Sequence, residues 1–246
     1  MKLTDLSNAG RKVLRVKYCG AVIVAAGNAS RMGGIDKVMA PLHGEPLILR
    51  TVRAFQSCDV IREIVVVTRP DLIVPIMDIC KDLDKVTAVV AGGSDRAESV
   101  RIGMSALSHK VKLAAIQDGA RPLVSKELID RVVRAAHTYG GAVPGIPVKD
   151  TIKTAEGGLI GQTPDRKTLR AIQTPQVFDY DLLRGALKKA QTEGWEITDD
   201  CSAVEKLGMK VKIVEGDERN LKVTTPMDLK IAALLLEEMY ENRTRI

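Results

Sequence analysis

The sequence predicts an α/β fold: an open, mostly parallel twisted sheet with flanking helices and a protruding β-arm. Short apolar segments alternate with helix-like segments along most of the chain, a pattern typical of parallel strands joined by helical crossovers. The chain has 246 residues, of which 45% are hydrophobic, and this is enough to bury the core of a single domain. The alternation stops at residues 151–168, where the arm is expected.

The strands are predicted from short runs that are rich in β-branched residues. The first run is Ala21–Val24, and others lie at 64–68, 86–91 and 113–117. Such runs suit strands that are buried on both faces, as in a parallel sheet. Asp118 directly follows the last of them, so its carboxylate is expected at the carboxyl edge of the sheet, where open α/β sheets bind ligands.

Helices are predicted between these strands from the signals at their ends. Pro46 suits the first position of a helix over 46–57, because its fixed φ and missing N–H cost nothing there. A second helix is expected over 71–81. Ser94 is expected to cap the helix that follows Gly92-Gly93.

The helix over 125–139 carries the most complete signals. Ser125 is the expected N-cap, and Gly140-Gly141 is expected to end the helix. Three apolar residues at helical spacing should form its buried face: Leu128, Val132 and Val133.

Residues 151–168 break this pattern, because short β-like runs flank Gly157-Gly158 and indicate a hairpin. A hairpin with little core of its own is only marginally stable. It therefore needs a surface to pack on, and a second copy of the chain is the obvious candidate. We expect a homodimer formed through a β-arm at 148–170, with an exposed flexible loop as the alternative.

Several classes of protein are not expected. No apolar run approaches the length of a membrane span, and residues 1–17 lack the apolar stretch of a signal peptide. We read them as an N-terminal extension to a single cytoplasmic domain at 18–238. The net charge of +6 is compatible with a nucleic-acid partner, but no basic run is interleaved with aromatic residues. We therefore expect small phosphate-bearing substrates rather than nucleic acid.

The four cysteines are widely scattered and include no C-x-x-C pair: Cys19, Cys58, Cys80 and Cys201. This spacing fits neither a zinc site nor a disulfide framework. Each is expected to be a small apolar residue, buried or half-buried.

The first strand leads into the most informative stretch. It ends at Ala25-Ala26-Gly27, and Arg31 and Lys37 follow. Small residues let backbone N–H groups approach a ligand closely, and two nearby cations suit a polyanion such as a nucleoside triphosphate. The stretch matches neither the P-loop nor the G-x-G-x-x-G fingerprint, so an ordinary turn with solvated basic residues is the alternative.

The pattern A-A-G-x-x-x-R-M-x(4)-K resembles the sugar-nucleotide pyrophosphorylase and cytidylyltransferase superfamily. Six further segments narrow the resemblance to the 2-C-methyl-D-erythritol 4-phosphate cytidylyltransferases of the non-mevalonate isoprenoid route, over about residues 16–237. They are AGGSDRAESVRIG (91–103), QDGARPLVS (117–125), PVKDTIK (147–153), QTPQVF (173–178), ITDDCSAVEKLG (197–208) and EGDERNLKVTTPMDL (215–229).

The resemblance implies a Rossmann-like nucleotidyltransferase. It would transfer CMP from CTP to 2-C-methyl-D-erythritol 4-phosphate, with Mg²⁺, release pyrophosphate and form 4-diphosphocytidyl-2-C-methyl-D-erythritol. A cytidylyltransferase for another polyol phosphate, such as ribitol 5-phosphate, is the alternative; the loop at 25–27 and the segment at 147–153 favour methylerythritol phosphate. A catalytically silent nucleotide-binding protein is disfavoured, because Lys37 and Lys222 are both present.

The resemblance also implies the site residues. The catalytic set consists of cations that act on the triphosphate: Arg31, Lys37 and Lys222. The nucleotide-binding set consists of small residues, a hydroxyl and a carboxylate: Ala25, Ala26, Gly27, Gly92, Ser99 and Asp118. Asp118 would hold Mg²⁺ or a ribose, with a turn-capping role as the alternative.

The acceptor phosphate would be held by hydroxyl and guanidinium groups, which suit a phosphate dianion. These are Arg121, Thr151, Arg166 and Thr174. Two of the four lie on or beside the arm, so the site would be completed across the dimer. Thr198 and Asp199 are as suited to capping a helix as to holding a ligand.

Overall fold

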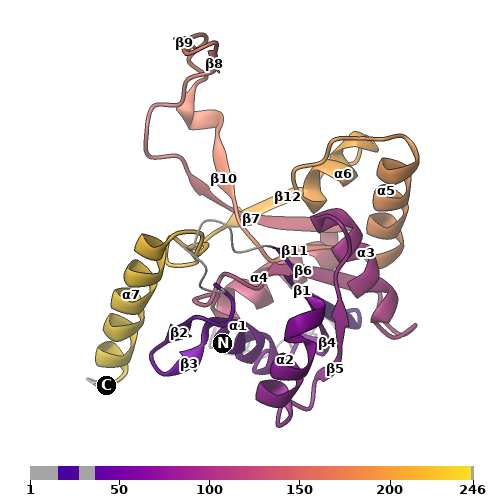
Figure 1. Ribbon diagram of the computed structural model, residues 1–246. Coiled ribbons are helices and arrows are strands. Elements are labelled where there is room, and N and C mark those ends of the chain that lie inside the picture. Colours follow the sequence, from indigo (N-terminus) through magenta and orange to yellow (C-terminus); the bar gives the residue numbers. More distant parts are fainter. Residues whose placement is uncertain (1–15, 28–36, 245–246) are drawn as a thin grey trace, which may run out of the picture.

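The computed structural model describes residues 16–27 and 37–244, and in this part of the chain eight strands form one sheet (Figure 1). In spatial order the strands are β10 (Arg170–Ile172), β7 (Gly141–Pro147), β11 (Gln176–Asp179), β6 (Leu113–Asp118), β1 (Cys19–Ala25), β4 (Ile61–Thr68) and β5 (Val86–Ala91), and β12 (Lys212–Glu215) also pairs with β7. β1 pairs in parallel with β4 and β6, and β4 with β5. The four predicted strands are thus confirmed as one parallel half of the sheet.

The other half is mixed. β11 is antiparallel to both β6 and β7, β10 is antiparallel to β7, and β12 is parallel to β7. Because β11 lies directly beside β6, the segment that precedes β11 comes close to the carboxyl end of β6. This topology brings residues about 56 positions apart into the same site, as Asp118 and Thr174 show below.

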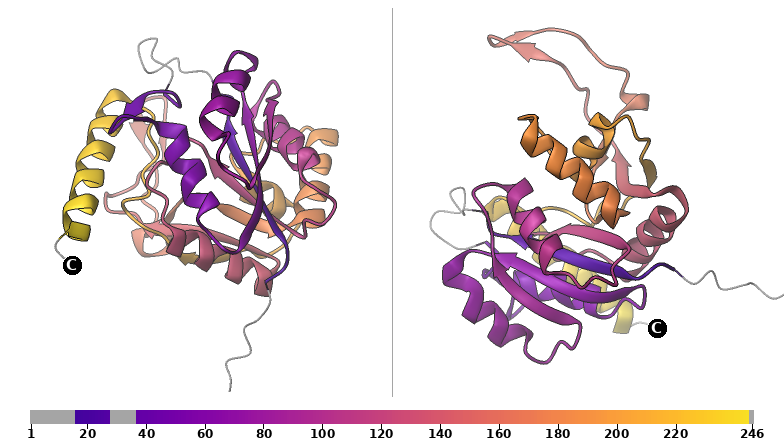
Figure 2. Two further views of the ribbon diagram at one scale, coloured as in Figure 1. Left: turned by 90° about the horizontal axis from the view of Figure 1, so that it is seen from below. Right: turned by 90° about the vertical axis from the view of Figure 1, so that its right-hand side faces the viewer.

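Helices cover both faces of the sheet (Figure 2). They are α1 (Leu47–Gln56), α2 (Ile73–Cys80), α3 (Arg96–Ala106), α4 (Lys126–Tyr139), α5 (Tyr180–Thr192) and α6 (Asp200–Lys206), whereas α7 (Pro226–Thr244) is placed differently. Ile23 and Val66 belong to the core under α1, α2 and α4, whereas Val22 and Val67 belong to the core under α3, α5 and α6. This alternation follows from the period of two along a strand.

The last helix, α7, lies beside the main body rather than over the sheet (Figure 1). It packs through Ala232 and Leu236 against Leu42 and Leu47, at the small hairpin of β2 (Pro41–Leu42) and β3 (Glu45–Pro46). The packing of α7 therefore also holds the segment that leads into this helix.

The signals predicted for α4 are confirmed. The Ser125 hydroxyl accepts a hydrogen bond from the Leu128 N–H at 3.2 Å, and Gly140 ends the helix with φ of +80°, a conformation that suits glycine. The predicted apolar face is fully buried: Leu128, Val132 and Val133. All four cysteines are buried and unpaired, as predicted.

Some predicted helix ends are wrong. Asp95, not Ser94, caps α3, because the cap accepts from the third helical residue, and the Glu98 N–H lies 2.8 Å from Asp95 Oδ1. Ser94 instead donates its N–H and its hydroxyl to Glu98 Oε2. Pro46 precedes α1 as its N-cap. The helix predicted over 71–81 consists of a 3₁₀ turn, η1 (Pro70–Leu72), followed by α2.

A hairpin-tipped arm extends away from the sheet between β7 and β10, as predicted (Figure 1). Its tip pairs β8 (Ala155–Glu156) with β9 (Leu159–Ile160), and the turn between them uses positive φ at Gly157 and Gly158. A 3₁₀ turn, η2 (Arg166–Thr168), lies on the returning limb. None of the described helices is long and apolar enough to cross a membrane.

Candidate active site

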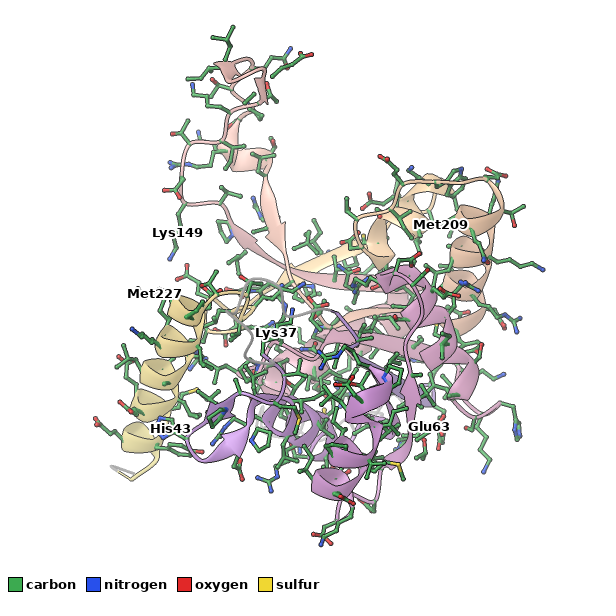
Figure 3. The ribbon with its side chains drawn as sticks, in the orientation of Figure 1. Lys37, His43, Glu63, Lys149, Met209 and Met227 are labelled. Atoms are coloured by element: carbon green, nitrogen blue, oxygen red, sulfur yellow. The ribbon has the colours of Figure 1, made fainter. Side chains whose placement is uncertain are left out.

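A pocket of about 290 Å³ lies at the carboxyl ends of β1 and β6. The predicted site residues among those that line it are Ala25, Ala26, Gly27, Lys37, Ser99, Asp118 and Lys222. They come from segments that are far apart in the sequence, and parallel strand order explains why they meet, since the carboxyl ends share one edge. Lys37, labelled in Figure 3, lies near the centre of the molecule. Arg31 lies outside the described residues.

Close packing shapes the side of the pocket formed by β1 and α3. A Cβ at Gly92 would lie 2.4 Å from the Ala26 Cβ and 2.8 Å from the Ser99 hydroxyl. Glycine is therefore required there for the end of β1 and the start of α3 to approach each other. Gly92 allows this close packing but is not among the residues that line the pocket, whereas its neighbour Gly93 lines it.

Ser99 holds the backbone of this loop. Its hydroxyl donates to the Asp95 carbonyl at 2.8 Å and accepts from the Gly93 N–H at 3.1 Å. The side chain is buried yet reaches the pocket wall. Both contacts fix the small-residue wall at which a base would bind.

Asp118 is the electrostatic centre of the pocket. Its carboxylate lies 2.8 Å from Lys222 Nζ, 3.6 Å from Arg96 Nε and 3.7 Å from Arg121 Nε. Burial by itself would raise the pKa of this carboxyl, but the three cations outweigh burial and hold the pKa of Asp118 below its usual value. Asp118 is therefore an anion in a cluster with excess positive charge.

An ion pair that sequence reasoning missed lies next to this carboxylate, and its arginine lines the pocket. Arg96 Nη2 lies 2.7 Å from Asp200 Oδ2, and Asp200 is 1% exposed. Burial disfavours the Arg96 cation, but Asp200 outweighs this and raises the pKa of Arg96. Burial raises the pKa of Asp200 as well. Both residues lie in quoted motifs, yet no spacing rule links partners that are 104 positions apart.

The predicted acceptor residues fall into two groups. Thr174 and Arg121 lie beside Asp118: the Asp118 N–H donates to the Thr174 hydroxyl at 3.1 Å, and Arg121 forms the ion pair given above. Thr151 and Arg166 lie on the exposed arm, where Arg166 Nη1 donates to the Lys149 carbonyl at 2.6 Å. Figure 3 shows Lys149 at the base of the arm. Within one chain the four residues are not brought together.

The pair Thr198 and Asp199 has a helix-capping role. Asp199 Oδ1 accepts from the Ser202 N–H at 2.9 Å at the start of α6. The Thr198 N–H donates to the Ser202 hydroxyl at 3.1 Å. Of the two roles considered for these residues, the structure contains the cap of α6.

Comparisons with known proteins agree with this geometry. The sequence profile of the IspD family, 2-C-methyl-D-erythritol 4-phosphate cytidylyltransferase, matches residues 19–238. A relative of that name from Caldanaerobacter subterraneus subsp. tengcongensis is 44% identical over 227 residues, which cover 89% of this chain and 98% of the relative. Another from Geobacillus kaustophilus is 42% identical over 225 residues, with coverage of 90% and 98%.

Solved structures show the same similarity. The 4-diphosphocytidyl-2C-methyl-D-erythritol synthase of Anaerococcus prevotii superposes with a TM-score of 0.82 at 29% identity, covering 90% of this chain and 99% of that one. The 2-C-methyl-D-erythritol 4-phosphate cytidylyltransferase of Thermus thermophilus gives a TM-score of 0.74 at 35% identity, with coverage of 88% and 98%. The fold, the pocket and the match over residues 19–238 together show that this chain belongs to the 2-C-methyl-D-erythritol 4-phosphate cytidylyltransferase family of nucleotidyltransferases.

Proposed function

We propose that the protein transfers CMP from CTP to 2-C-methyl-D-erythritol 4-phosphate and releases pyrophosphate. Family membership supports the reaction. The observation that carries the proposal is the pocket that Lys37 and Lys222 line together with a small-residue strand end and the carboxylate of Asp118. The relatives compared are named for methylerythritol phosphate, so ribitol 5-phosphate is not favoured as the acceptor.

The chemistry requires cations rather than a covalent intermediate. An oxygen of the acceptor phosphate attacks the α-phosphorus of CTP, a new P–O bond forms, and the bond to the pyrophosphate oxygen breaks. Both reactants are anions, and charge builds up on the α-phosphate oxygens in the transition state. Lys37 and Lys222 are assigned to this charge, because pre-positioned cations in a partly dry pocket stabilise it strongly. Arg31 is assigned to the triphosphate by motif resemblance alone.

The nucleotide is assigned to the wall built by Ala25, Ala26, Gly27, Gly92 and Ser99. Cytosine presents an amino donor beside two acceptors, which backbone carbonyls and amides are able to read. Asp118 is assigned to Mg²⁺ or to the ribose. One carboxylate plus substrate phosphates is a usual environment for Mg²⁺, so Asp118 fits that ion, which would neutralise phosphate charge. Among the described residues no cluster of three or more metal-ligating side chains is present.

The acceptor site is proposed to be shared between two copies of the chain. Arg121 and Thr174 lie close to Asp118, whereas Thr151 and Arg166 project on the arm. The tip of the arm exposes Leu159 and Ile160, which are 76% and 73% exposed, and apolar side chains of this kind favour burial against a partner. The homodimer would bring the arm of one copy to the pocket of the other.

A cytoplasmic location is proposed as well. Four cysteines that form no disulfide suit it.

One assay tests the proposal. Purified protein with Mg²⁺ and CTP is offered methylerythritol 4-phosphate or ribitol 5-phosphate, and pyrophosphate release is followed. We expect release with methylerythritol phosphate and little with ribitol phosphate. Equal silence with both acceptors overturns the proposed activity, and a preference for ribitol phosphate overturns the proposed acceptor.

A further inference from the structure

We propose that Asn220 is a positioning residue that sets the place of Lys222 relative to the acceptor side of the pocket. The proposal deepens the proposed function and rests on the assignment of Lys222 to the α-phosphate. It concerns the segment between β12 and α7, which carries this lysine and forms neither helix nor strand.

The segment is held by contacts on both sides of the lysine. One residue after Lys222, the Val223 N–H donates to the Ala120 carbonyl at 2.8 Å. Two residues before it, Asn220 is fully buried although its neighbours along the segment reach the surface. A buried amide in an irregular segment needs partners; here Nδ2 has one and Oδ1 has none among the described residues. The bond that Nδ2 makes shows what the side chain fixes.

Asn220 contacts two residues of the predicted acceptor site. Its side-chain Nδ2 donates to the Thr174 carbonyl at 2.8 Å, and its backbone carbonyl accepts from Arg121 Nη1 at 2.7 Å. The Thr174 hydroxyl in turn accepts from the Asp118 N–H. One residue therefore links the strand end that carries Asp118, the start of β11 and the segment that carries Lys222.

A second contact ties the same segment to the arm. Gln173 directly follows β10, the strand that returns from the arm. Its side chain donates to the Asp217 carbonyl at 2.8 Å and accepts from the Asp217 N–H at 3.2 Å. The Asn220 N–H donates to that same Asp217 carbonyl at 3.0 Å. The base of the arm and the segment that leads to Lys222 are thus hydrogen-bonded to the same residue, Asp217.

This arrangement matters because the lysine does not fix its own position. Lysine carries a point charge on a flexible four-carbon stem, and the Lys222 side chain is 41% exposed, with an ion pair to Asp118. A single ion pair at that exposure restrains it weakly. The place of the backbone, which Asn220 and Val223 set, decides where the ammonium group is held.

A double-mutant cycle separates positioning from simple stabilisation. We expect Asn220→Ala to lower kcat by about tenfold or more while the KM for CTP changes by less than about twofold, and to lower kcat by less than about twofold when Lys222→Ala is already present. A merely structural role would give the same factor in both backgrounds, and that result overturns the proposal. If Asn220→Ala does not fold, Asn220→Ser is used in the same cycle.

Gln176→Ala is the matched control. Gln176 is a buried amide that bonds the start of α6, through Asp199 Oδ2 at 2.7 Å and the Cys201 N–H at 2.9 Å. Its loss removes two buried side-chain hydrogen bonds, one more than Asn220→Ala removes, without touching the segment of Lys222. We expect its effect on kcat to be the same in both backgrounds.

A second measurement needs no turnover. Labelling with a lysine-reactive reagent, read by mass spectrometry, reports how firmly Lys222 is held, with exposed Lys110 as reference in the same molecule. We expect Asn220→Ala to speed labelling of Lys222 several-fold relative to Lys110, and Gln176→Ala to leave the ratio unchanged. An unchanged ratio in Asn220→Ala overturns the proposal even if the wild-type protein proves inactive with CTP, so its failure is distinguishable from failure of the proposed function.

Discussion

Lys222 Nζ lies 2.8 Å from Asp118 Oδ2. The cation assigned to the α-phosphate and the carboxylate assigned to Mg²⁺ or ribose are thus partners of each other. An incoming triphosphate has to share or replace this contact, and the excess positive charge around Asp118 makes that exchange favourable. The neighbouring cations keep the Asp118 carboxyl ionised before substrate arrives.

Removal of Lys37 or Lys222 is expected to destabilise the transition state. Lys37→Ala or Lys222→Ala should lower kcat by a factor of about 10² or more, because each charge acts mainly on the α-phosphate as it reacts. Steady-state pyrophosphate release measures this, and circular dichroism verifies that the variants fold. Near-wild-type turnover in either variant would remove that lysine from the mechanism.

Ser99 is expected to matter for the base. Ser99→Ala leaves the half-buried Gly93 N–H without its partner, and the cost should be about 1–3 kcal/mol. The affinity for CTP, measured by calorimetry, should fall, and discrimination against UTP should relax. Ser105→Ala is the matched control, because Ser105 lies on the same helix, is exposed and bonds only the Arg101 carbonyl in the described structure. Equal CTP affinity in both variants contradicts the role of Ser99.

The cations around Asp118 predict how stability depends on pH. The pKa of Asp118 is lowered in the folded state, so its stabilising effect is complete above the unfolded pKa of about 4 and is lost as pH falls through the folded value. Asp118→Asn should therefore be less stable than wild type at pH 7, and the difference should shrink below about pH 4. Urea unfolding at pH 7, 5 and 3 measures it. A difference that stays constant over this range argues against a charged Asp118 in the fold.

Mixed dimers test whether the acceptor site is shared. If Arg166 of the partner subunit completes the site that contains Lys37, Lys37→Ala and Arg166→Ala homodimers should both be nearly inactive. Co-expression should then restore wild-type composition to roughly a quarter of all sites, given random pairing in a two-fold dimer. If Arg166 serves its own chain, every site carries one lesion. No recovery after verified subunit exchange therefore rejects the shared site.

The sequence predicted the parallel half of the sheet because its strands are short and β-branched, as Val86–Ala91 illustrates. It did not predict β7, whose sequence GAVPGIP holds two prolines and two glycines, residues that are unfavourable in strands. Pairing with β10, β11 and β12 overrides this local preference. Strand identity there depends on neighbours that the sequence does not reveal.

The site shows the same division. The motif at 215–229 predicted Lys222 as a site residue, small residues at 25–27 predicted a ligand-binding turn, and the structure places both at the pocket. Arg96 and Asp200 were missed, because an ion pair between residues of two helices depends on how the helices pack and not on any local pattern. The cap of α3 was misplaced by one residue, since Ser94 and Asp95 are both good caps and only the register of the first turn distinguishes them.

The antiparallel placement of β11 beside β6 also affects when the pocket is able to form during synthesis of the chain. The pocket needs the end of β1, the Asp118–Thr174 contact and the docking of Val223 onto Ala120. These pieces leave the ribosome in sequence, and the last of them appears only when most of the chain has been synthesised. A nascent chain that stops before residue 222 has the parallel strands but no complete pocket. We therefore expect this protein to acquire nucleotide binding only late in translation.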